Sequence, residues 1–224
     1  LVPIRLDLDS DGYRLRDTFT WDLNNELIDP KWFAQGLCID LELPSELFVS
    51  AIVQSIEDQL EDYRHDTESS DGEQLVWVDD ELRVVIRIDI IIGHIALRDQ
   101  FEWDEWVDGT LCSQPVTPEQ VARVLCSEKA LGGEFETSIA HSIREQLYAF
   151  VKSFLLAGYN HQPQMMPRKL ADHVLPPVVS ALRNLPATQT FAPVIVHLHT
   201  VDAERLEKDA DRESRRKRRQ GRGR

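Results

Sequence analysis

The sequence has few cysteines, and their spacing excludes the sites that cysteine usually builds. Cys38, Cys112 and Cys126 are odd in number and show no paired metal-ligand spacing. A disulfide framework is therefore not indicated, and the chain suits a reducing compartment. Cys38 and Cys126 each follow a leucine, which predicts small buried core residues rather than reactive thiols.

Long apolar runs and catalytic motifs are also missing. No run approaches the roughly 18 apolar residues of a membrane-spanning helix, and no signal-peptide pattern opens the chain. A glycine-rich phosphate loop, a G-x-S-x-G elbow and an H-E-x-x-H helix are absent. We therefore predict no catalytic residue, no cofactor, no metal site and no membrane association. Because the first residue is Leu1 rather than methionine, we expect a fragment of a longer protein.

Positive charge is scarce until the end of the chain. The 224 residues carry a formal charge of -14, yet residues 212–224 hold eight Lys or Arg and a single Glu. The tail thus carries +7, against -21 on residues 1–211. Because the acidic body repels a phosphate backbone, direct nucleic-acid contact is expected to be secondary and to use the tail.

The clearest pattern that is present is a duplication. Residues 15–22 read LRDTFTWD and residues 97–104 read LRDQFEWD, with six of eight positions identical at a separation of 82. The same separation aligns PIRLDL with VIRIDI upstream, so the pattern predicts an internal repeat. Because both copies carry them, the shared acidic and aromatic residues are interpreted as a structural signature of each repeat rather than as a pair of active sites. They are Asp17, Phe19, Trp21, Asp99, Phe101 and Trp103.

Each copy reads as a β-hairpin followed by two helices. In the first copy, alternating residues 2–8 and 13–19 flank a turn with Gly12. Asp29 and Pro30 predict a helix start, and the second helix follows Pro44 with an apolar residue every four positions. Those apolar residues are Phe48, Ile52, Ile56 and Leu60.

In the second copy, residues 82–92 and 95–103 flank Gly93, and six extra residues follow Asp104. Thr117 and Gln120 predict a capping box. The expected buried positions of the two helices are Val121, Val124 and Leu125 in the first, and Phe135, Ile139, Ile143 and Leu147 in the second.

The predicted fold class is α+β, with two tandem ββαα repeats followed by a basic C-terminal helix. The expected domains are residues 1–63 (first repeat), 64–81 (acidic linker), 82–150 (second repeat), 151–200 (connecting segment) and 201–224 (basic helix and tail). In the connecting segment, Leu182 and Leu185 favour a helix and Val194–Ile195–Val196 a strand. Repeats of about 65 residues have thin cores, so we expect an apolar surface between hairpin and helices that a partner covers.

Several polar groups are candidate sites. Arg212, Arg215, Arg216 and Arg219 share one face of the basic helix, and guanidinium groups suit both carboxylates and phosphates. A solvated tail and a nuclear localisation signal remain open as alternatives.

His197 and His199 would lie on one side of a strand, but without a third ligand an ordinary strand position is favoured. Asp17 and Asp99 are expected to cap or to pair with Arg16 and Arg98, while cross-strand pairs are expected to use Arg5, Asp7, Arg87 and Asp89.

Four segments together resemble the Snf-five, or integrase-interactor, family of subunits of SWI/SNF and RSC chromatin remodellers. They are LVPIRLDLDSDGYRLRDTFTWD, IRIDIIIGHIALRDQFEWD, LGGEFETSIAHSIREQL and DRESRRKRR. The resemblance covers about three quarters of the chain. It is poor over residues 151–190, and the insertion after Asp104 departs from the family pattern.

This resemblance implies a nuclear, non-enzymatic scaffold in a complex whose ATPase is a separate subunit. It implies that the repeats hold SWIRM-containing subunits and that the basic helix docks on the acidic patch of the histone octamer. Carried over by position, the nucleosome-binding residues are Arg212, Arg215, Arg216, Arg218 and Arg219, with Lys217 where the family can have an apolar residue. A nucleic-acid-binding adaptor that uses the basic tail is the alternative.

Overall fold

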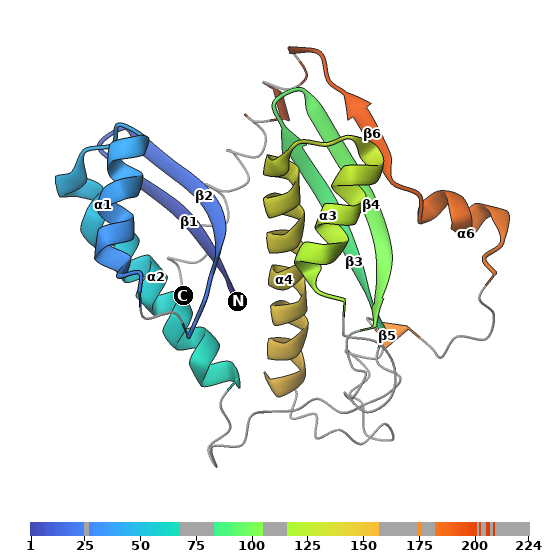
Figure 1. The fold of residues 1–224 in the computed structure, drawn as a ribbon, viewed down its shortest axis with the longest axis horizontal. Coiled ribbons are helices and arrows are strands. Elements are labelled where there is room, and N and C mark those ends of the chain that lie inside the picture. The colour runs from blue at the N-terminus through green and yellow to red at the C-terminus, as the bar shows by residue number, and fades with distance from the viewer. Residues whose placement is uncertain are drawn as a thin grey trace. The chain divides into compact units, whose positions relative to one another are not determined.

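The computed structural model is an α+β structure with one two-stranded and one four-stranded sheet (Figure 1). It describes residues 1–24, 27–67, 83–104, 116–156, 174–175 and 182–200, together with Asp202, Arg205, Leu206 and Lys208. Within these residues, no helix is long and apolar enough to cross a membrane. In chain order the elements are β1 (Val2–Ser10), β2 (Tyr13–Trp21), α1 (Pro30–Asp40), α2 (Ser45–Thr67), β3 (Arg83–Ile92), β4 (Ile95–Asp104), α3 (Pro118–Lys129), α4 (Gly133–Leu156), β5 (Val174–Leu175), α6 (Leu185–Thr190) and β6 (Val194–His197).

The chain divides into two compact units. The first contains Leu1–Val85 and Glu102–Pro177, and the second contains Ile86–Phe101 and Val178–Arg224. The order β1-β2-α1-α2 is followed by β3-β4-α3-α4, as the sequence pattern indicates. The interpretation of these elements as tandem repeats, with the domain limits given above, stays a prediction.

The first unit begins with the predicted hairpin. β1 and β2 pair antiparallel from Val2 opposite Trp21 to Ser10 opposite Tyr13. The loop residues Asp11 and Gly12 have φ angles of 45° and 82°. Positive φ at both loop positions is what a type I′ turn needs, and glycine adopts it without steric cost.

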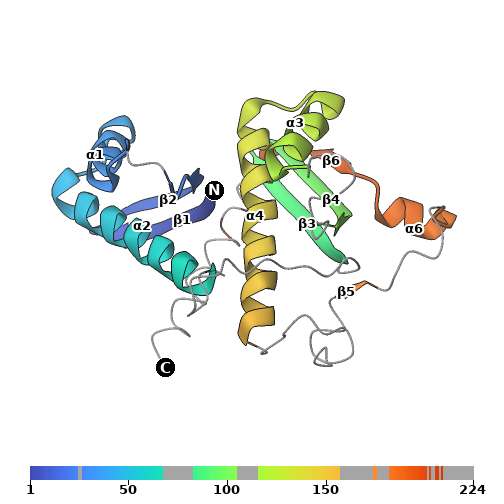
Figure 2. The ribbon, with the colours of Figure 1, turned by 60° about the horizontal axis from the view of Figure 1, so that its bottom comes forward.

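The helices α1 and α2 cover one face of this hairpin, as Figures 1 and 2 show from two directions. Asp29 caps α1 by accepting the N–H of Lys31, with Pro30 in the first turn as predicted. All four predicted apolar positions of α2 are buried in one cluster with alternate residues of β1. Each such side chain contributes about 1.5–3 kcal/mol relative to an exposed one. The cluster contains Val2, Ile4, Leu6, Leu15, Trp21, Ala34, Cys38, Phe48, Ile52, Ile56 and Leu60.

The helices α3 and α4 pack against each other in the same unit. The predicted capping box is present, because Thr117 and Gln120 each accept a hydrogen bond from the other's backbone N–H. The predicted buried face of α3 is wrong at Val124, which is 57% exposed, whereas Ala122 and Cys126 are buried. These two small residues lie four apart, so they share a face and allow the helix to approach closely. The predicted apolar positions of α4, Phe135, Ile139, Ile143 and Leu147, are all buried.

In the second unit, β6 adds to the edge of β4 (Figure 1). The strand order is β5-β3-β4-β6, and Ile95 to Arg98 pair antiparallel with His197 to Val194. The predicted strand at Val194–Val196 is confirmed, and a helix begins at Leu185. His199 lies beyond the end of β6, so the two histidines do not share a strand. Most of the predicted basic helix lies outside the described residues.

Candidate interaction site

The signature aromatic residues of the first half lie in its core. The Trp21 and Phe33 rings meet edge to face with centroids 5.4 Å apart, and Phe19 lies 4.8 Å from Phe33. Trp103, the equivalent of Trp21, is also buried. Because little of either indole is accessible, the two tryptophans do not themselves form a binding face.

The signature carboxylates bind their own strands. Asp17 accepts the N–H of Thr18 at 2.8 Å, and Asp99 accepts the N–H of Gln100 at 2.8 Å. Both carboxylates lie within strands rather than at a helix start, so these bonds are not the expected caps.

The expected pairing of these carboxylates with the neighbouring arginines is wrong. Arg16 pairs with Asp7 and Arg98 pairs with Asp89, each at 3.3 Å. Consecutive strand residues point to opposite faces, whereas residues directly opposite on paired strands share a face.

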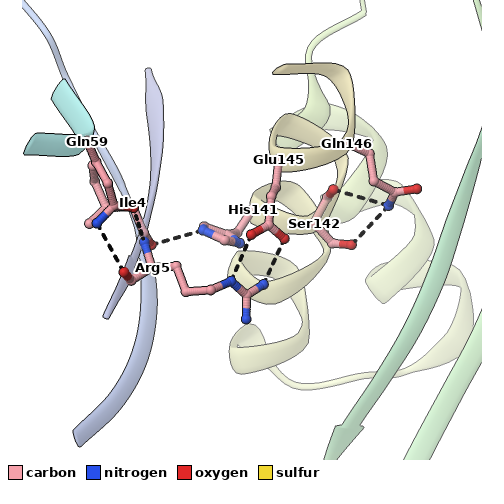
Figure 3. A network of polar contacts seen from close by, with 7 residues as sticks. All are labelled: Ile4, Arg5, Gln59, His141, Ser142, Glu145 and Gln146. Carbon is pink, nitrogen blue, oxygen red and sulfur yellow. Dashed lines mark hydrogen bonds and ion pairs between the residues drawn. The ribbon is translucent and has the colours of Figure 1, made fainter. Parts of the chain in front are cut away.

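A network that the sequence did not predict joins β1 to α4 (Figure 3). The Arg5 guanidinium binds Glu145 through two hydrogen bonds of 2.7 Å each, instead of the expected cross-strand partner. The side-chain amide of Gln59, from α2, accepts the Arg5 N–H at 2.9 Å and donates to the Arg5 carbonyl at 3.1 Å. One residue of β1 is therefore held by α2 through its backbone and by α4 through its side chain.

His141 of α4 lies beside this ion pair and is buried. Its Nε2 is 3.0 Å from the Ile4 carbonyl oxygen. Because a carbonyl only accepts, Nε2 carries the proton and donates. Burial is the main reason that the pKa of His141 lies below its ordinary value, with Glu145 opposing the shift and Arg5 adding to it.

The carboxyl of Glu145 experiences the opposite balance. Burial by itself raises its pKa, but the bonds from Arg5 outweigh burial and hold the pKa below the ordinary value. The interaction with Glu145 in turn raises the pKa of Arg5. The site thus combines a neutral imidazole with a charged Arg–Glu pair at neutral pH.

A second polar cluster joins the end of α2 to α4. Asp66 accepts hydrogen bonds from the Tyr148 hydroxyl at 2.6 Å and from the Lys152 ammonium group, 2.8 Å away. The centroids of the Tyr63 and Tyr148 rings lie 5.0 Å apart. Burial raises the pKa of Asp66, yet the bonds from Lys152 and Tyr148 bring it below the ordinary value.

These contacts come from one stripe of α4. His141, Glu145, Tyr148 and Lys152 are spaced by four, three and four residues and so share a helical face. The apolar stripe that begins at Phe135 occupies another face. A polar stripe beside an apolar one was the available sequence signal, but it does not reveal which element the polar stripe contacts.

The outer face of α1 carries exposed apolar side chains. Trp32 is 68% exposed and Ile39 is 73% exposed, and their seven-residue spacing places them on one face. At the separation of 88 that aligns the two first helices, the second copy has Gln120 and Ser127 there. We call Trp32 and Ile39 the outer face of α1.

The expected apolar surface between hairpin and helices is therefore misplaced in the first half. That region is filled by the core cluster, because two helices suffice to cover one face of a two-stranded sheet. Exposed apolar side chains are instead present on the far side of α1, at Trp32 and Ile39.

The remaining candidate residues are the cysteines, the possible metal ligands and the arginines of the tail. Cys38 and Cys126 are buried as predicted, and burial raises the pKa of both thiols, which disfavours reactivity. Among the residues that the structure describes, no His, Cys, Asp and Glu cluster suits a metal ion. Cys112 and the tail residues Arg212, Arg215, Arg216, Arg218 and Arg219 lie outside the described part of the chain.

Comparison with known proteins gives a consistent result. The family model described as SNF5 / SMARCB1 / INI1 matches residues 1–215. The chain is 36% identical to the SWI/SNF chromatin-remodeling complex subunit snf5 of Schizosaccharomyces pombe over 255 residues, covering 99% of this chain and 39% of that protein. It is 36% identical to subunit SNF5 of Saccharomyces cerevisiae, covering 99% of this chain and 25% of that protein.

A plant relative is also similar. The chromatin structure-remodeling complex protein BSH of Arabidopsis thaliana is 34% identical, over 77% of this chain and 67% of its own length. The chain spans less than half the length of the two yeast subunits. With a family model matching nearly the whole sequence, the chain belongs to the SNF5 / SMARCB1 / INI1 family.

Proposed function

We propose that this chain is the scaffold region of a chromatin-remodelling complex subunit that works in the nucleus and performs no catalysis itself. The carrying observation is the similarity along 99% of the chain to proteins named as SWI/SNF subunits. ATP hydrolysis then belongs to another subunit of the same complex.

The scaffold is proposed to consist of two tandem ββαα repeats. Matching hydrogen bonds support the duplication beyond the sequence pattern. Gln59 donates to the Ser55 carbonyl and hydroxyl, and Gln146 donates to the Ser142 carbonyl and hydroxyl. The separation of 87 between these pairs is the one that aligns the second helices.

The repeats are proposed to bind SWIRM-containing subunits. The outer face of α1 supports such a role, because Trp32 and Ile39 expose large apolar side chains that a partner would cover. Tryptophan is also enriched among the residues that dominate binding energy. Because the equivalent positions on α3 are polar, the two repeats are proposed to use different surfaces.

The arginine-rich helix is proposed to dock on the acidic patch of the histone octamer. Arg212, Arg215, Arg216, Arg218 and Arg219 supply guanidinium groups whose paired donors match carboxylates. Reversal to Glu at Arg215, Arg216 and Arg219 should weaken nucleosome binding of the purified chain by at least about tenfold, or 1.4 kcal/mol. The matched control reverses Lys217, Arg222 and Arg224, which changes net charge equally; its affinity should fall much less.

Equal losses of nucleosome affinity in both variants would indicate attraction by net charge alone and would contradict docking through the arginine face.

The alternative function, a nucleic-acid-binding adaptor, has the basic composition of the tail in its favour. Competition separates the two. Free DNA should displace a nucleic-acid-binding tail with a steep salt dependence, whereas an acidic-patch peptide should displace a histone-binding one.

A further inference from the structure

The edge of β4 shows how this type of hairpin accepts another strand. Ala96 lies opposite Val196 and Arg98 opposite Val194, and pairing ends there. Outward-facing backbone groups alternate along a strand, so the next outward N–H belongs to Gln100. Asp99 accepts that N–H at 2.8 Å, which removes the donor that a longer β6 would need.

The hairpin of the first unit has the corresponding edge on β2. At the separation of 82, residues 13–16 correspond to residues 95–98. Asp17 accepts the N–H of Thr18 at 2.8 Å and so ends this edge at the same place. Within the part of the chain that the structure describes, β2 has β1 as its only neighbouring strand.

The outer edge of β1 is occupied in a different way. Pro3 has no backbone N–H, and the backbone N–H and carbonyl of Arg5 both bond to the Gln59 amide. A strand adding to this edge would have to displace Gln59. Of the two edges of the first sheet, β2 is therefore the one suited to pairing.

We propose that the β2 edge from Tyr13 to Arg16 binds an extended segment of another protein subunit as an added antiparallel strand. The mode is the β-strand addition that other recognition domains use. The segment takes the place on β2 that β6 takes on β4.

The side chains of β2 specify the chemistry of that segment. Arg14 and Arg16 lie on one face, where β4 has Ala96 and Arg98, and the buried Leu15 lies on the other face with Tyr13. Carboxylates opposite the two arginines extend the Arg–Asp pairs already present across the hairpin. An apolar residue between them would lie opposite Leu15. The expected segment therefore alternates acidic and apolar residues.

A second copy of this chain fits the edge less well. Antiparallel self-pairing centred on Leu15 would place Arg14 of one copy opposite Arg16 of the other, and like charges in that position are destabilising. This inference goes beyond the proposed function and does not depend on the arginine tail.

Two measurements on the 224-residue chain test the proposal. First, hydrogen exchange should be faster at residues 13–16 than at residues 95–98, which β6 already covers. Second, a capped eight-residue peptide that alternates Glu and Ile should bind and slow exchange at residues 13–16. A matched peptide with Lys in place of Glu should bind at least about tenfold more weakly.

Two variants at one position separate backbone pairing from side-chain attraction. Arg16→Pro removes an outward N–H and should abolish peptide binding, whereas Arg16→Ala keeps the N–H and should retain part of it. Far-UV circular dichroism checks that both variants are folded. The proposal is overturned if residues 13–16 are as protected as residues 95–98 in the free chain, if neither peptide binds, if both bind equally, or if the chain dimerises through this edge.

Discussion

The Arg5–Glu145 pair allows a quantitative test of the contact between β1 and α4. The two side chains are joined by two hydrogen bonds of 2.7 Å, and they remain 55% and 40% exposed. Exposed ion pairs contribute about 0.2–1 kcal/mol, and a bidentate geometry places this pair at the upper end. We therefore expect a coupling energy of about 1 kcal/mol between the two side chains.

A double-mutant cycle measures this coupling. Arg5→Ala, Glu145→Ala and the double variant are compared with the parent by urea unfolding. Arg5→Ala leaves the backbone bonds to Gln59 in place, so the cycle isolates the side-chain contact. Because the pair is half exposed, the coupling should fall by about half or more in 1 M salt, where the screening length is about 3 Å.

The Arg98–Asp89 pair is the control within the same chain. It has a single 3.3 Å contact, and its side chains are 59% and 66% exposed, so its coupling should be only about 0.2–0.3 kcal/mol. An Arg5–Glu145 coupling as small as that of the control would contradict a two-hydrogen-bond contact between these side chains in solution.

Two further predictions concern single residues. The pKa of His141 in the folded chain lies below its unfolded value, so the neutral imidazole stabilises the fold. The contribution of His141 to the unfolding free energy is complete above about pH 6.5. It is lost as the pH falls through the lower folded pKa. His141→Gln should flatten this part of a curve of unfolding free energy against pH, and a curve as steep as the parent's would show that another group titrates. Thr117→Ala removes one half of the capping box and should lower the unfolding free energy by about 1 kcal/mol. Thr137→Ala, on the exposed surface of α4, serves as the control. Equal losses of unfolding free energy in the two variants would contradict a capping role for Thr117.

Local signals were sufficient for most of the elements. These elements depend on residues that are close together in the sequence, so their patterns could be recognised there. Examples are the alternation around Gly12 and Gly93, the caps at Asp29 and Thr117, and the four-residue apolar spacing of the helices. The face of α3 was misjudged because apolar character alone favoured Val124 over Ala122. Close packing against α4 selects small residues, and that constraint is visible only when the partner helix is in place.

The polar contacts were not predictable in the same way. Arg5 has an acidic residue two positions away along its own strand, yet its partner is Glu145, 140 positions along the chain. Charge patterns rank nearby partners first, whereas the observed partner depends on the packing of α4 on the hairpin. The outer face of α1 was missed for a related reason, since Trp32 lies among apolar residues that do face the core.

The α4 stripe determines where the helix lies on β1 more than how tightly it is held. Each half-exposed ion pair stabilises the contact by only about 1 kcal/mol or less. An apolar contact of similar size would stabilise it by a similar amount. A shift of α4 by one turn, about 5.4 Å, would break the bonds of His141, Glu145, Tyr148 and Lys152 together. It would also leave the buried His141 N–H without the Ile4 carbonyl, a loss of about 1–3 kcal/mol. Apolar side chains tolerate such sliding because their attraction has no direction. The polar stripe therefore gives α4 one register on the first hairpin.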